Sequence, residues 1–220
     1  STDTRSKPIR LQEWKTYAFA DKGVYFDNQF PGARLNDIQH LEDSVYKATI
    51  KPENAPINMS PWYAFKVWSE KPKQIALQLT YEDGRHRYHP KVSRNKTYWS
   101  PLEEERYLPD TATKSATLLL NVGPDTLWVS AQELNPPQHV YSWVEYMGDK
   151  PWVRVQNIGI STEGRPLKLM SIGKEGSKHM LVVISGQHPP EITGFKAMQA
   201  FVEAIAADTE LARTFRGMFE

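Results

Sequence analysis

The stretch Leu181-Val-Val-Ile-Ser-Gly-Gln-His-Pro-Pro-Glu-Ile-Thr-Gly-Phe-Lys-Ala-Met-Gln-Ala-Phe-Val-Glu-Ala-Ile205 decides the fold of the C-terminal part of the chain. It opens with an apolar run typical of a buried strand, and later apolar residues recur on one helical face: Phe195, Met198, Val202 and Ile205. We therefore expect a strand over residues 180–185 that leads into a helix over residues 192–205.

An imidazole and a carboxylate, His188 and Glu191, lie between these two elements. The intervening Pro189 and Pro190 exclude a helix across the pair, so we expect a turn at the carboxyl end of the strand. A His-x-x-Glu pair can supply two of the three protein ligands of a catalytic zinc ion, whose fourth position holds water. In the alternative interpretation the turn is an ordinary polar loop, where the charge of Glu191 suits the helix dipole.

The residues before this turn extend the pattern. Ile158-Gly-Ile-Ser-Thr-Glu-Gly-Arg-Pro-Leu-Lys-Leu-Met-Ser-Ile-Gly173, the apolar strand and His-Pro-Pro-Glu together resemble the opening of the catalytic domain of the zinc metallocarboxypeptidases, peptidase family M14. The resemblance implies that His188 and Glu191 bind Zn²⁺ and that the whole protein removes C-terminal amino acids from peptides or proteins. Pro190 departs from the family pattern, which has Gly or Arg there, so any substrate contact from that position is lost.

The N-terminal part shows short runs rich in β-branched and aromatic residues, separated by turn residues. Such runs predict an antiparallel sandwich of about six to eight strands. The runs are Val24–Phe26, Val45–Ile50, Pro61–Trp68, Gln74–Tyr81, Ser115–Asn121 and Thr126–Ser130.

Part of this region also resembles the β-sandwich domain that precedes the catalytic domain in cytosolic-type carboxypeptidases. The matching segments are Ser60-Pro-Trp-Tyr-Ala-Phe-Lys-Val67, Tyr88-His-Pro-Lys-Val-Ser93 and Tyr98-Trp99. His86 and His89 lie close by, and their spacing beside a turn is more typical of surface polarity than of a metal site.

Taken together, the patterns predict an α+β chain of two domains. Residues 1–22 are expected to be an N-terminal arm, 23–135 a β-sandwich, and 136–220 the start of an α/β carboxypeptidase-like domain. The polar connector Gln132-Glu-Leu-Asn-Pro-Pro-Gln-His139 marks the boundary. After it we expect a helix over 140–147 and strands over 152–160 and 167–172, joined by a turn at Gly164-Arg-Pro166.

The site expected from the resemblance is incomplete in this chain. The resemblance implies a second histidine ligand, a catalytic glutamate, a tyrosine and an arginine for the substrate carboxylate, all from segments beyond Glu220. We therefore expect the 220-residue chain to be a front portion that is inactive alone, and that associates with itself or with a partner fragment through an incomplete sheet. Two alternatives remain: a zinc-dependent deacylase of the aspartoacylase type, and a non-catalytic β-sandwich binding module.

Composition sets the remaining limits. The chain has a net charge of +1, which argues against nucleic acid as its main partner, and no apolar run long enough for a membrane helix. It contains no cysteine, so disulfides and thiolate metal sites are excluded. The compartment stays open between the cytoplasm and, if a signal peptide has been removed, the periplasm or the exterior.

Overall fold

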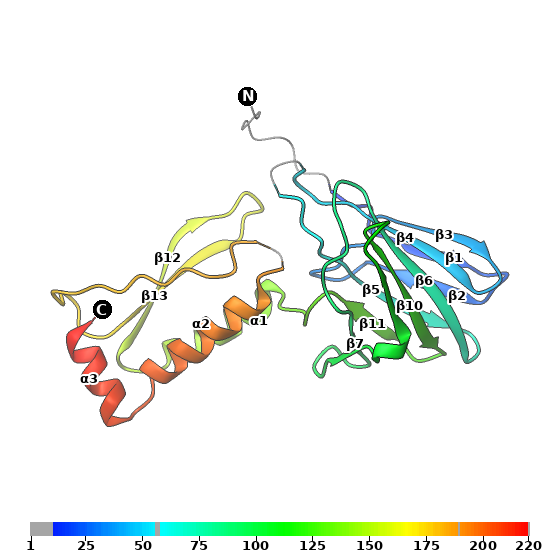
Figure 1. The fold of residues 1–220 in the computed structure, drawn as a ribbon. Helices are drawn as coiled ribbons and strands as arrows, with labels where there is room; N and C mark the ends of the chain where they lie inside the picture. Colours follow the sequence, from blue (N-terminus) through cyan, green and yellow to red (C-terminus); the bar gives the residue numbers. More distant parts are fainter. Residues whose placement is uncertain (1–10, 56–57, 189, 220) are drawn as a thin grey trace. The chain divides into compact units, whose positions relative to one another are not determined.

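The computed structural model describes residues 11–55, 58–188 and 190–219. The chain divides after Leu134 into two compact units, and His188 and Pro190 group with the first of them. Figure 1 shows the strands of the N-terminal unit in blue to green and the helices at the end of the chain in orange to red.

The N-terminal unit consists of two sheets. The six-stranded sheet has the order β1-β2-β5-β11-β7-β8 and the five-stranded sheet the order β3-β4-β6-β10-β9. A short 3₁₀ helix, η1 (Glu104–Arg106), precedes β9. The strands are β1 (Thr16–Phe19), β2 (Val24–Asp27), β3 (Asp37–Glu42), β4 (Val45–Ile50), β5 (Ala64–Ser69), β6 (Lys73–Tyr81), β7 (Lys91–Ser93), β8 (Ser100–Pro101), β9 (Tyr107–Asp110), β10 (Ser115–Val122) and β11 (Leu127–Ser130).

Strands are present at each of the runs that the sequence indicated, so these predictions are confirmed. The predicted pairing is wrong at one place, because β4 and β6 pair in parallel. The reason is the path of the chain. β5, which lies between β4 and β6 in sequence, belongs to the six-stranded sheet, so the chain returns to the five-stranded sheet running in the direction of β4.

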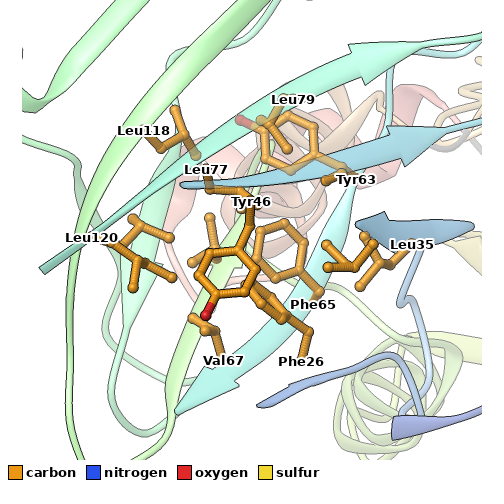
Figure 2. Packing of buried hydrophobic residues seen from close by; sticks show 14 of the residues in the cluster. Phe26, Leu35, Tyr46, Tyr63, Phe65, Val67, Leu77, Leu79, Leu118 and Leu120 are labelled. Atoms are coloured by element: carbon orange, nitrogen blue, oxygen red, sulfur yellow. The ribbon is translucent and has the colours of Figure 1, made fainter. Parts of the chain in front are cut away.

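The core of this unit lies on the inward side of both sheets. In β4 every second residue is buried, and β6 and β10 show the same alternation, which follows from the period of two along a strand. Each fully buried large apolar side chain contributes about 1.5–3 kcal/mol relative to exposure. Figure 2 shows the packing of Phe26, Leu35, Tyr46, Tyr63, Phe65, Val67, Leu77, Leu79, Leu118 and Leu120.

The predicted N-terminal arm, residues 1–22, is wrong for its last part. Thr16–Phe19 forms the edge strand β1, which pairs antiparallel with β2, and the ring of Tyr17 is buried. The side chain of Asn28 fixes the preceding segment by accepting from the Lys15 N–H at 2.8 Å and donating to the Glu13 carbonyl at 2.7 Å. Residues 1–10 of the predicted arm lie outside the described residues.

The described residues of the C-terminal unit form three helices and a β-hairpin. Its elements are α1 (Pro137–Gly148), β12 (Val153–Ile160), β13 (Pro166–Ile172), α2 (Ile192–Ile205) and α3 (Glu210–Met218). β12 and β13 pair antiparallel through the predicted turn. The predicted face of α2 is confirmed, because Phe195 and Val202 are buried and Met198 and Ile205 are partly buried. None of the described helices has the length and apolar character that a membrane span requires.

The predicted strand over 180–185 is absent. This segment pairs with no strand among the described residues, and its apolar side chains are exposed rather than buried. The exposed fractions are 73% for Met180, 48% for Leu181, 69% for Val182, 46% for Val183 and 71% for Ile184. A strand needs a neighbour that satisfies its N–H and C=O groups, and the described part of this unit provides only the two-stranded hairpin. The sheet that this strand was expected to join is therefore limited, within the described residues, to β12 and β13.

Arg216 closes the C-terminal end of α2. Its Nη1 donates to the carbonyl oxygens of Ile205 at 2.6 Å and Ala207 at 2.8 Å, and the guanidinium lies 4.2 Å from the ring centroid of Trp152. A cation at this end also complements the helix dipole. Only 7% of Arg216 is exposed, so these contacts lie in the interior of the unit.

We expect Arg216→Met to destabilise the C-terminal unit by about 1–3 kcal/mol, because two carbonyl oxygens lose a charged donor. Hydrogen exchange of the α2 and α3 amides measures the effect. Arg213→Met is the matched control on the same helix. Arg213 pairs with Asp208 at an exposed position, so its loss should change stability by less than about 0.5 kcal/mol. Equal effects of the two substitutions would contradict the role assigned to Arg216.

Candidate metal-binding segment

The segment between β13 and α2 carries the two predicted zinc ligands. Gly186 has a φ of +67°, a left-handed conformation that Gly adopts without strain. The N-cap residue of α2 is Glu191, whose Oε2 accepts a hydrogen bond from the Gln187 N–H at 3.1 Å. This bond spans the proline turn, so it restrains the loop that contains His188. Pro189 itself lies outside the described residues.

A hollow of about 490 Å³ lies between this segment and one side of α2. Glu191 lines it together with the exposed ring of Phe201 and the thioether of Met198. Small residues, Gly194 and Ala197, leave space along the helix. The remaining lining residues come from the extended segment: Val183, Ile184, Ser185, Gly186 and Gln187. The hollow is open and mainly apolar, with one carboxylate at its rim, which is a shape that accepts an apolar group beside a charged or metal-binding centre.

The structure places the two predicted ligands as follows. The side chains of His188 and Glu191 are both exposed, and His188 groups with the N-terminal unit whereas Glu191 groups with the C-terminal unit. The part of the prediction that placed them at a strand end is wrong, because no strand precedes them. That they share one metal ion stays a prediction.

The two side chains fit zinc in ligand type but fall short of it in number. Imidazole nitrogen and carboxylate oxygen are both common zinc ligands, and a catalytic site needs three protein ligands. Within residues 11–55, 58–188 and 190–219 no group of three or more His, Cys, Asp or Glu side chains is placed to hold a metal ion. The described residues therefore do not complete a catalytic zinc site, although His188 and Glu191 have the chemistry of two of its ligands.

A histidine that the sequence assigned to surface polarity lies in an aromatic cluster of the N-terminal unit. His86 Nδ1 lies 2.9 Å from Tyr81 Oη, and its Nε2 lies 3.0 Å from Tyr107 Oη. Its ring also stacks against Tyr63. Burial lowers the pKa of His86 to about 4, against the opposing effect of a backbone hydrogen bond with Tyr88. His86 is therefore neutral at pH 7, and the surface-polarity prediction is wrong for it.

Comparison with known proteins finds a family match for the C-terminal part of the chain. Residues 140–216 match the family model of the zinc carboxypeptidases, Peptidase_M14. This segment contains the hairpin, both predicted ligands, α2 and nearly all of α3. This part of the chain is therefore similar to the zinc carboxypeptidases, over about a third of the chain's length. No curated protein matches the sequence.

Solved structures share the fold over most of the chain. A metallo-carboxypeptidase from Burkholderia cenocepacia aligns with a TM-score of 0.75 at 16% identity over 89% of this chain. A putative carboxypeptidase from Burkholderia mallei gives 0.76 at 15% identity over 89%, and a metallo-carboxypeptidase from Pseudomonas aeruginosa gives 0.73 at 17% identity over 88%. The aligned part is 53% of the first of these chains and 52% of the other two, so this chain spans about half their length. At these identities the likeness shows the fold.

Proposed function

We propose that the chain is part of a zinc-dependent metallocarboxypeptidase that removes C-terminal amino acids from peptides or proteins. The family match over residues 140–216 carries this proposal, because it includes the segment with His188 and Glu191. The likeness of the fold to bacterial metallo-carboxypeptidases supports it. No observation favours the deacylase or the non-catalytic module over this function.

In this proposal residues 23–135 form a sandwich domain of the cytosolic-carboxypeptidase type, and residues 136–220 form an incomplete catalytic domain. His188 and Glu191 hold the metal ion, and the substrate is a peptide or protein C-terminus. The hollow beside Glu191 gives room for an apolar group of the substrate, because Met198 and Phe201 line it.

A zinc titration tests the assignment of the two ligands without relying on activity. We expect added Zn²⁺ to shift the ring resonances of His188 in NMR spectra, with weak affinity because two ligands hold the ion less firmly than three. Glu191→Gln should weaken zinc binding by about tenfold or more. Even the loss of a residue that only hydrogen-bonds to a metal ligand lowers metal affinity by about this factor.

The control in this titration is His139, an exposed histidine at the start of α1. His139→Ala should leave the zinc affinity unchanged, whereas His188→Ala should abolish the zinc-dependent shifts. If zinc affinity is the same in His188→Ala, in Glu191→Gln and in the unmodified chain, the two residues are not metal ligands and the proposed function loses its site.

A further inference from the structure

A second hollow, of about 430 Å³, opens within the N-terminal unit. It is bounded by the loop that follows β7, by the segment before η1, and by the ends of β10 and β11. Its lining includes Val92 and the ring of Tyr98, which is 78% exposed, together with Leu102, Leu120 and Leu127, which expose at most 6% of their surface. The hollow is open to solvent and combines these apolar side chains with polar and charged ones, and small-molecule sites combine the two kinds of group in this way.

Two guanidinium groups converge on one residue at the rim of this hollow. Arg94 Nη2 donates to the main-chain carbonyl of Asn121 at 3.2 Å, and its Nη1 donates to the carbonyl of Asp125 at 2.9 Å. When the side-chain amide of Asn121 is oriented with its oxygen toward Arg106, this oxygen accepts hydrogen bonds from Arg106 Nη1 at 2.9 Å and from Arg106 Nη2 at 2.8 Å. Neutral oxygens of Asn121 and Asp125 therefore hold both guanidinium groups at the rim.

The charge at the rim is positive. Besides the two arginines, the lining contains one carboxylate, Glu103, whose Oε2 lies 3.8 Å from Arg106 Nη1. A guanidinium has five N–H donors, so each arginine has donors beyond those used in its bonds to carbonyl oxygens. The pair Arg94 and Arg106 thus offers charged donors in the planar geometry that suits a carboxylate.

The loop that forms one wall is held in place by its own side chains. Ser93 Oγ accepts from the N–H groups of Asn95 and Lys96, and Asn95 Oδ1 accepts from the N–H groups of Thr97 and Tyr98 at 2.9 Å each. A wall fixed in this way lowers the cost of ordering on binding, because little conformational freedom is lost.

We propose that this hollow is a binding site for a small carboxylic acid with an apolar body. The apolar body packs against Val92 and the exposed ring of Tyr98, and the carboxylate accepts hydrogen bonds from Arg94 and Arg106. The site lies within the N-terminal unit alone, so it is separate from the metal-binding segment and does not depend on the proposed peptidase activity.

Calorimetric titration of the 220-residue chain with 3-phenylpropionate tests this site. We expect binding in the millimolar range or tighter, weaker at high salt because the pairing is electrostatic. The alcohol 3-phenylpropan-1-ol has the same apolar body without the charge, and it should bind at least about tenfold more weakly, since hydrogen bonds to charged groups are the stronger ones.

Substitutions then assign the site to its residues. The double variant Arg94→Gln and Arg106→Gln should lower the affinity for 3-phenylpropionate by about tenfold or more. Arg85→Gln removes one exposed arginine of the same unit that does not line the hollow, and it should leave the affinity unchanged. The proposal is overturned if the unmodified chain does not bind the acid, if the alcohol binds equally well, or if the double variant retains full affinity. The acid–alcohol comparison uses the unmodified chain, so it holds even where a variant folds poorly.

Discussion

The purified 220-residue chain, supplied with zinc and peptides, will release no C-terminal amino acids above the rate of zinc alone. Catalytic zinc is held by three protein ligands, and the proposed site has two, His188 and Glu191. No group of three potential ligand side chains is found within the described residues. A metal held by two side chains exchanges with solvent, so it cannot fix water and substrate in the geometry that accelerates the reaction.

The measurement is chromatographic detection of free amino acids from peptides with apolar, acidic and basic C-termini. Solution mass is recorded on the same sample, because an assembly could supply further ligands from a second chain. Metal-dependent turnover by a monomer, lost in His188→Ala, would show that the segment is sufficient and that the inactivity expected here is wrong.

Local patterns predicted the strands of the N-terminal unit well, for a physical reason. In β4, Tyr46, Ala48 and Ile50 alternate with more exposed residues, and this alternation is a local property of a half-buried strand. The edge strand β1 was assigned to an arm because Thr16–Phe19 is short and follows a polar, basic segment. Its place in the sheet depends on pairing with β2, which is not a local property.

For the candidate site, in contrast, local sequence patterns were not sufficient. The apolar run from Leu181 to Ile184 has the composition of a buried strand, but burial requires neighbours that composition does not reveal. His86 was assigned to the surface because its tyrosine partners Tyr81 and Tyr107 are brought together only by the pairing of β6, β10 and β9. In both cases contacts between distant parts of the chain decide the outcome.

Self-association of the chain is the second large effect that we expect, because the apolar residues 180–184 are exposed. An extended apolar segment without a partner strand in the described part of its unit presents N–H and C=O groups that can pair with another chain. Val182 and Ile184 are 69% and 71% exposed, so their burial against a second copy would gain about 25 cal/mol for each Å² of apolar surface. We propose that two copies meet through residues 180–184.

Light scattering after size exclusion, over a range of protein concentrations, measures this association. The unmodified chain should form dimers or larger species, whereas Val182→Lys combined with Ile184→Lys should be monomeric, because charge on an open edge opposes pairing. Leu11→Lys is the matched control, since Leu11 is 78% exposed but lies outside the segment, and this variant should still associate. If the unmodified chain is monomeric at every concentration, or if the double variant associates as strongly, the segment is not the interface.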